Sequence, residues 1–391
     1  MINKNVLLMS LQYFCANIFY VFPFVFLQPF LEYIGYNVIE RGILLSSCAI
    51  VAIVSQFFIG YLCDKYKTNK KFYIFTVVFV VLSAVLLYSQ TEKNFIFHLI
   101  LVASISGLLR TLMAIQDAWC LEIDNDTKRF YGPIRGFGSL GWMLASPLVS
   151  IFISSYGYYS LVYSSIITGG VLMAISLVVK DATKHDSNEP ITNNDIKLLL
   201  ANKEFVLIIL IFLIINVLDT ANVYTVIDKL MFLQASDQLM SYRWSIQAFV
   251  ELPIFLMGTY LLKRFGDYKL MMFSSFMFTI KFLLFAISKT PEQIILVTIL
   301  QAITFPLFLI SSKSLVDSIT PSNLKSSGQT IASSLSNGPA LLLTPIISGL
   351  LINSFGVDST LLIFGIFGIL SLVFGYKLKV LRKLILIDSI D

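Results

Sequence analysis

The chain has 391 residues, of which 57% are hydrophobic and only 13% are charged. A soluble domain carries about 25% charged residues, so this composition excludes an ordinary water-soluble enzyme or binding module. The net charge of +5 does not indicate nucleic-acid binding, because basic residues in membrane proteins usually mark one side of the bilayer. We therefore expect a lipid bilayer as the surrounding solvent and no nucleic-acid partner.

The apolar runs are long and continuous. Only helices and closed barrels satisfy their backbone hydrogen bonds in lipid, and barrel strands would alternate in polarity. The first run, from Val6 to Leu31, is too long for a signal-peptide core and is followed by no small-residue cleavage site. It therefore predicts a first membrane helix, and the class is an all-α membrane protein.

Taken in chain order, the apolar runs between polar breaks predict about twelve spanning helices. The first six lie near 6–31, 42–63, 72–89, 94–118, 133–154 and 158–179, and the second six near 205–227, 243–262, 269–288, 291–317, 328–352 and 358–377. A polar stretch separates the two sets. We expect an N-terminal six-helix bundle at 1–179, a linker at 180–204 and a C-terminal six-helix bundle at 205–391.

Basic residues concentrate in alternate loops, as in Lys65, Lys67, Lys70 and Lys71. The positive-inside rule then places both termini in the cytoplasm of a multi-pass protein, which we expect in the cell membrane. The halves also repeat, because Gly258 follows Gly60 by 198 residues and Gly328 follows Gly132 by 196. Two bundles related in this way predict a substrate cavity near the bilayer midplane.

The sequence offers little support for catalysis. Its four cysteines, Cys15, Cys48, Cys63 and Cys120, lack the spacing of a zinc or redox site, so we expect no metal and no cofactor. There is no nucleophile elbow, zinc-protease motif or phosphate-binding loop, so we expect no catalytic residues, no enzyme and no ATP-driven pump. The motif Gly136-Phe-Gly138-Ser-Leu-Gly141 has no preceding strand and predicts a helix-packing face.

The loop after the second predicted helix reads Gly60-Tyr-Leu-Cys-Asp64-Lys65-Tyr-Lys67, followed by further lysines. It resembles the signature loop of the major facilitator superfamily, except that Lys67 stands where the family prefers glycine. Gly60 would permit close helix approach, while Asp64 would meet the polar end of a neighbouring helix. The resemblance implies the major facilitator fold and a gating role for Gly60, Asp64 and Lys65.

A second stretch, Gln116-Asp117-Ala118 with Tyr131-Gly-Pro-Ile-Arg135 and Trp142, is similar to the lactose permease and phenylpropionate permease branch. The resemblance implies that Asp117 and Arg135 bind substrate hydroxyls and that Trp142 stacks on a sugar ring. A purely structural ion pair between Asp117 and Arg135 is the alternative. The residues around Glu251 and Pro253 resemble the phenylpropionate permease side of the branch.

The lactose permease couples protons through a histidine and a glutamate on helix 10, and here Gln301 and Thr304 stand in those places. Its helix 9 arginine appears as Lys281, and an acid on helix 7 matches Asp219. Charges that remain inside a bilayer usually face a cavity and find a partner. Arg110 and Asp117 lie seven residues apart, on one helix face. We expect Arg110 and Lys281 to join the substrate site.

Glu251 is the first candidate for a proton carrier, because an apolar surrounding favours its neutral form, and Asp219 is the second. The sequence thus predicts a secondary active transporter for a small-molecule substrate, working by alternating access and proton symport. A sugar-transport role, for an oligosaccharide or glycoside, is the main interpretation. The alternatives are an aromatic-acid or nucleoside carrier of the same fold and a membrane sensor that transports nothing.

Overall fold

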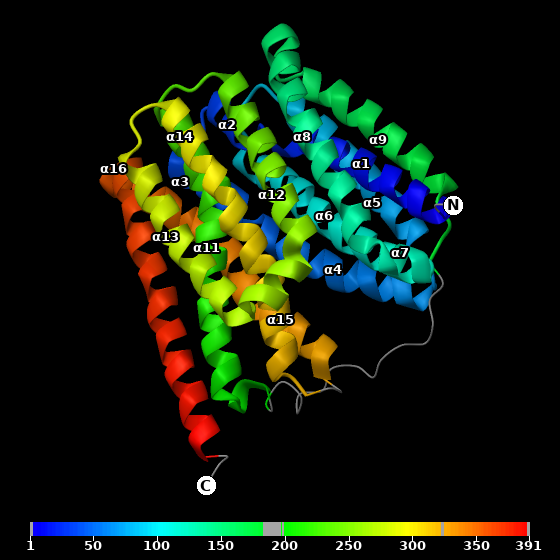
Figure 1. Ribbon diagram of the computed structural model, residues 1–391. Helices are drawn as coiled ribbons and strands as arrows, with labels where there is room; N and C mark the ends of the chain where they lie inside the picture. The colour runs from blue at the N-terminus through cyan, green and yellow to red at the C-terminus, as the bar shows by residue number, and fades with distance from the viewer. Residues whose placement is uncertain (1–2, 183–196, 198, 322–323, 389–391) are drawn as a thin grey trace. The chain divides into compact units, whose positions relative to one another are not determined.

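The computed structural model describes residues 3–182, 197, 199–321 and 324–388. Within these ranges all regular secondary structure is helical, and there is no strand. Figure 1 shows the helices coloured along the chain, from α1 in blue to α16 in orange and red. Their bounds are α1 Lys4–Phe24, α2 Leu27–Tyr33, α3 Val38–Ser46, α4 Cys48–Lys65, α5 Lys70–Tyr88, α6 Phe95–Glu122, α7 Asn125–Arg129, α8 Tyr131–Tyr156, α9 Ser160–Val178, α11 Lys203–Phe232, α12 Asp237–Phe265, α13 Asp267–Ile287, α14 Pro291–Thr298, η1 Ile299–Ile303, α15 Phe305–Ile319 and α16 Lys325–Asp388. Most of the predicted linker 180–204 lies outside the described residues.

Eleven stretches in the described part of the chain are long and apolar enough to cross a membrane. The last of them, Gly328–Lys383, contains two helices, because α16 is interrupted at Gly356, whose φ of 79° is left-handed. Glycine adopts this conformation without the clash that a Cβ would cause. The described residues therefore form twelve spanning segments, which confirms the predicted all-α membrane fold.

Two predicted helices are continuous in the sequence pattern but broken in the structure. The run predicted at 6–31 is divided between α1 and α2 just after Pro23, and the run predicted at 291–317 is divided into α14, η1 and α15. Proline removes a helical hydrogen bond, and a short 3₁₀ segment inside a helix often marks a hinge. Hydrophobic periodicity does not detect such local breaks.

The contacts divide the chain into two compact units. Unit 1 comprises Met1–Ser187 and Gln234–Leu252, and unit 2 comprises Asn188–Leu233 and Pro253–Asp391. Helix α12 therefore contributes its first part to unit 1 and the part that begins at Pro253 to unit 2. The bundle boundaries at 179 and 205 stay a prediction.

Small residues bring α8 close to α1 in unit 1. A Cβ added at Gly141 would collide with the backbone oxygen of Phe14, and one added at Gly138 would lie 2.5 Å from Asn17 Nδ2. An added Cβ at Gly136 would meet nothing within 4 Å. The glycine motif is thus a helix-packing face at two of its three positions, as predicted, and it fixes how α8 lies against α1.

The loop between α4 and α5 is held by a carboxylate from beyond α9. Asp181 accepts hydrogen bonds from Thr68 Oγ1 at 2.6 Å and from the backbone N–H groups of Asn69 and Lys70 at 3.2 and 3.1 Å. It thereby satisfies amides at the start of α5, next to the positive end of the helix dipole. Lys67 in the same loop has a φ of 51°, which explains why the family pattern prefers glycine there.

Gly60, Asp64 and Lys65 all lie on the last turns of α4, where Asp64 and Lys65 are exposed. An added Cβ at Gly60 would meet no atom within 4 Å. The close helix approach expected at Gly60 is therefore wrong for this structure. The gating role of the three residues stays a prediction.

Candidate functional site

An ion pair joins α6 to α8 in unit 1. Arg135 Nη1 lies 3.4 Å from Asp117 Oδ2, and the two side chains are 46% and 31% exposed. Tyr13, from α1, donates its hydroxyl to Asp117 Oδ1 at 2.7 Å, while Arg135 Nη1 donates to the Tyr131 hydroxyl at 2.8 Å. Three helices thus supply one polar cluster, defined here as Tyr13, Asp117, Tyr131 and Arg135.

The chain reaches this geometry through the short helix α7. Asp124 and Thr127 form a capping box at its start, and Asp124 Oδ2 also accepts a hydrogen bond from Asn5 Nδ2 at 2.7 Å. Burial opposes ionisation of Asp124, but these hydrogen bonds outweigh it and hold the pKa of its carboxyl below the ordinary value. The fixed turn returns the chain from α6 into α8, so that the start of α8 faces the end of α6.

An aromatic cluster lies further along α8. Trp142 and Phe24 meet edge to face with ring centroids 6.1 Å apart, and Trp244 of α12 lies 5.9 Å from Phe24 and 6.1 Å from Trp142. Trp244 is buried, whereas Phe24 and Trp142 are partly exposed. Edge-to-face rings of this kind contribute about 0.5 to 1.5 kcal/mol each beyond the area that they bury.

The two clusters share one face of α8. Trp142 follows Arg135 by seven residues, which is two helical turns and about 10 Å along the axis. Between them lie the Gly138 contact and Asn17, whose Nδ2 donates to its own helix at Tyr13 O, 2.9 Å away. One end of this face therefore offers charged and hydroxyl groups, and the other end offers aromatic rings.

Arg110 and Glu251 are the remaining residues of unit 1 that were predicted to bind substrate or carry the proton. Arg110 is partly buried near the middle of α6, two turns before Asp117, and Glu251 is partly buried near the middle of α12. Both make polar or electrostatic interactions in the structure. Midway positions are where transporters of inverted or parallel repeats hold substrate and coupling ions.

Asp219 and Lys281 belong to unit 2. Lys281 is fully buried on α13, donates a hydrogen bond to Gln301 Oε1 and lies over the rings of Phe278 and Phe285 at 5.7 and 5.6 Å. Gln301 stands in the 3₁₀ segment η1, so the helix break is tied to the buried cation. Asp219 is partly buried on α11 and also makes polar or electrostatic interactions.

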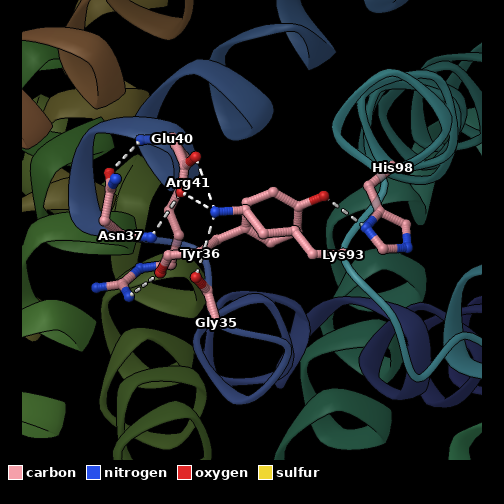
Figure 2. A network of polar contacts seen from close by, with 7 residues as sticks. All are labelled: Gly35, Tyr36, Asn37, Glu40, Arg41, Lys93 and His98. Atoms are coloured by element: carbon pink, nitrogen blue, oxygen red, sulfur yellow. Dashed lines mark hydrogen bonds and ion pairs between the residues drawn. The ribbon is translucent and has the colours of Figure 1, made fainter.

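A second polar network lies at the other end of α6, about 28 Å from Asp117 along the helix. Figure 2 shows Lys93 between Glu40 and the Tyr36 ring, and the Tyr36 hydroxyl directed at His98. Lys93 Nζ lies 2.8 and 2.7 Å from the two Glu40 oxygens, and Tyr36 Oη lies 2.8 Å from His98 Nδ1. These contacts fasten the α2–α3 connection to α6, far from the candidate site.

The repeat equivalent of Lys93 makes a similar link in unit 2. Lys289 follows Lys93 by 196 residues, the spacing of the glycine pair Gly132 and Gly328. Its Nζ lies 2.7 Å from Asp358 Oδ2, and Asp358 also pairs with the buried Lys229. In each unit, a lysine just after the third spanning helix therefore pairs with an acid from another helix, Lys93 with Glu40 and Lys289 with Asp358.

Sequence reasoning missed Tyr13 and Trp244. Tyr131 fell within the stretch read as family-like, but no role was expected of it. Tyr131 precedes Arg135 by four residues, a spacing that places two side chains on one helix face, so this signal was available. Tyr13 and Trp244 carry no comparable signal, because nothing in a tyrosine or tryptophan on an apolar helix separates a site residue from a packed one.

The described residues contain no cluster of His, Cys, Asp and Glu that would hold a metal ion. The site instead combines a paired guanidinium and carboxylate with hydroxyls and aromatic rings, among spanning helices. Charged, hydroxyl and aromatic groups gathered inside a membrane bundle are typical of membrane transporters.

Comparison with known proteins places the chain in this class. Residues 7–363 match the model of the MFS_1 like family, and the chain belongs to that family. The predicted major facilitator membership is thus confirmed, whereas the lactose and phenylpropionate permease branch is not.

Three relatives support the same fold. The xanthosine permease of Escherichia coli (strain K12) is 25% identical over 370 residues, which cover 89% of this chain and 87% of that protein. A crystal structure of the nucleoside transporter NupG, solved as a mutant, superposes with a TM-score of 0.83 at 18% identity, covering 96% of this chain and 100% of the other. A bacterial homologue of the human lysosomal transporter Spinster, in an inward-facing and unoccupied conformation, gives 0.72 at 11% identity, with 96% of each chain covered.

Proposed function

We propose that the protein is a secondary active transporter of nucleosides, driven by proton symport. The relatives support this substrate class, since one is named for xanthosine and another is a nucleoside transporter. They do not support the oligosaccharide or glycoside expected from the sequence. The nucleoside carrier, given above as an alternative, agrees better with these relatives than the sugar carrier does.

The observation that carries the proposal is the single face of α8 that begins at Arg135 and ends at Trp142. A nucleoside joins a hydroxylated sugar to a flat aromatic base. The guanidinium of Arg135, already neutralised by Asp117, offers paired donors to vicinal hydroxyls. Trp142 and Phe24 offer partly exposed rings on which a base stacks, an interaction worth about 1 to 3 kcal/mol.

The same residues explain the resemblance to sugar permeases. An acid and an arginine form charge-assisted hydrogen bonds with hydroxyls equally well in a disaccharide and in a ribose. Arg110 and Lys281 stay proposed members of the substrate site, Arg110 on the face of α6 that bears Asp117. Lys281 now donates a hydrogen bond to Gln301, and we propose that it donates to the substrate instead when substrate is bound.

Proton coupling is assigned to Glu251, with Asp219 as the second candidate. Glu251 lies near the middle of α12, where a carboxylate that takes up and releases one proton in each transport cycle would couple proton movement to substrate movement. Gly60, Asp64 and Lys65 would control the gate at the end of α4. Substitution of Asp64 by Asn would then slow turnover and leave substrate affinity unchanged.

The test is transport by the purified full chain in proteoliposomes. We expect saturable uptake of labelled xanthosine or uridine that an inward proton gradient increases, with no competition from a disaccharide or from phenylpropionate. Arg135→Lys should abolish this uptake, whereas the matched control Arg129→Lys, on α7, should retain it. Saturable uptake of the disaccharide without uptake of any nucleoside would overturn the proposal.

A further inference from the structure

The first part of α12 carries two buried polar atoms of opposite hydrogen-bonding character. Trp244 Nε1 is a donor and Gln247 Oε1 is an acceptor, and neither has a hydrogen-bond partner among the described residues. Trp244 is only 5% exposed. Gln247 follows Trp244 by three residues, so the two side chains lie on one face of the helix, one turn apart.

Trp244 is held firmly against the aromatic cluster. Ser245 Oγ donates to the backbone oxygen of Met143 at 2.6 Å, which fixes α12 against α8 beside Trp142. The buried guanidinium of Arg243 lies 4.9 Å from the Trp244 ring centroid. The orientation of Trp244 is therefore set by contacts on both sides, and its N–H is not free to turn toward water.

Unpartnered atoms of this kind need an explanation. Leaving a buried donor or acceptor unsatisfied costs about 1 to 3 kcal/mol, and a ligand that hydrogen-bonds to it removes that cost. Here the Trp244 donor lies beside the rings on which we place the base, and the Gln247 acceptor lies one helical turn further along the same face. A ligand that brings one acceptor and one donor on the edge of a flat ring would satisfy both at once.

We infer that Trp244 and Gln247 read the polar edge of the nucleobase, an inference that rests on the proposed nucleoside function. Trp244 Nε1 donates to a ring carbonyl, and Gln247 Oε1 accepts from the adjacent ring N–H. The preferred substrates are nucleosides whose base carries a carbonyl next to an N–H, such as 6-oxopurines and uracil. A ring without these groups stacks equally well but leaves both protein atoms unsatisfied.

The test compares two ligands that differ only at this edge. Inosine carries the 6-oxo group and the neighbouring N–H, and purine riboside lacks both. Affinity is measured on purified, folded protein, and we expect the native chain to bind inosine at least tenfold more tightly. Trp244→Phe, which keeps an aromatic ring, and Gln247→Met, which keeps the length of the side chain, should each bring the ratio close to one by weakening inosine binding alone.

The outcomes are distinguishable. If a variant lowers the affinity for both ligands by the same factor, or leaves the ratio at its native value, the edge-reading role is wrong although nucleosides are still bound. If the native chain binds neither inosine nor purine riboside, the proposed function itself fails. Because Gln247→Met changes a partly exposed side chain and no ring, it remains informative if Trp244→Phe does not fold.

Discussion

Tyr13 donates its hydroxyl to the carboxylate oxygen of Asp117 that does not face Arg135, so that the two oxygens of Asp117 serve two different helices. Hydrogen bonds to charged acceptors contribute about 1.5 to 3 kcal/mol. The hydroxyl therefore does more than fill space, because it fixes the rotation of the carboxylate that holds Arg135 in place.

Tyr13→Phe should accordingly weaken nucleoside binding about tenfold, which corresponds to about 1.4 kcal/mol. The matched control is Tyr20→Phe on the same helix, because the Tyr20 hydroxyl lies in a separate buried network with Tyr73 and Gln116, each 3.1 Å away. We expect Tyr20→Phe to lower the melting temperature and preserve affinity. Equal affinity in Tyr13→Phe and the native chain would remove Tyr13 from the binding site.

Arg135→Lys and Asp117→Asn test whether the ion pair binds substrate. Each should reduce affinity more than tenfold, because an ammonium does not reproduce the planar fork and an amide does not neutralise the guanidinium. A purely structural pair predicts lower expression or stability with near-normal affinity in the surviving protein. Equilibrium binding to purified, folded variants separates the two, and native affinity in Arg135→Lys would contradict the assignment.

Glu251→Gln should abolish accumulation of nucleoside against a gradient and preserve exchange of internal for external substrate. Exchange requires the loaded carrier to turn over without releasing its proton, and a neutral glutamine mimics the protonated acid. Uphill uptake and counterflow in the same proteoliposomes give the two readouts. Accumulation by the variant would transfer the coupling role to Asp219 or to another group.

The twelve helices and the Asp117–Arg135 pair were predictable because lipid imposes strict physical limits. A spanning helix needs roughly 20 apolar residues, and a charge inside it needs a partner. The lengths of the apolar runs therefore indicate the helices, and the few charges inside these runs indicate the ion pair. The breaks after Pro23 and around η1 were not predictable from periodicity, since they depend on a few backbone angles within a run that remains apolar.

The sequence distinguishes substrate classes less well than it predicts the ion pair between Asp117 and Arg135. An acid, an arginine and a tryptophan serve a sugar and a nucleoside equally well, so the motif alone favoured the better-known sugar permeases. The distinguishing groups, Trp244 and Gln247, stand more than a hundred residues further along the chain. Only packing of α12 against α8 brings Trp244 to Trp142, and no local pattern encodes that contact.

Asp181→Ala should destabilise the α4–α5 loop. The substitution removes the acceptor of three hydrogen bonds at the start of α5, where loss of a capping carboxylate costs about 1 to 2 kcal/mol. We expect a lower melting temperature and slower transport with unchanged substrate affinity. Asp126→Ala provides the control, since the Asp126 carboxylate accepts an exposed bond from Asn3 at 2.7 Å. Similar melting temperatures for the two variants would show that Asp181 does not support the loop.

Lys67→Gly, in contrast, should stabilise the protein. A side chain at a left-handed φ of 51° places its Cβ close to the following carbonyl oxygen, which costs roughly 1 to 2 kcal/mol, and glycine avoids this contact. Part of the gain is offset because glycine loses more backbone entropy on folding, so we expect a net stabilisation of about 1 kcal/mol.

Two control variants separate backbone strain from charge. Lys67→Ala removes the same charge and long side chain but keeps the Cβ, and Lys67→Asn introduces a residue that tolerates this conformation. The melting temperatures should therefore rank glycine first, asparagine second and alanine near the native lysine. If alanine stabilises the protein as much as glycine does, relief of charge repulsion among Lys65, Lys67 and Lys70 is the cause, and backbone strain at this position is not.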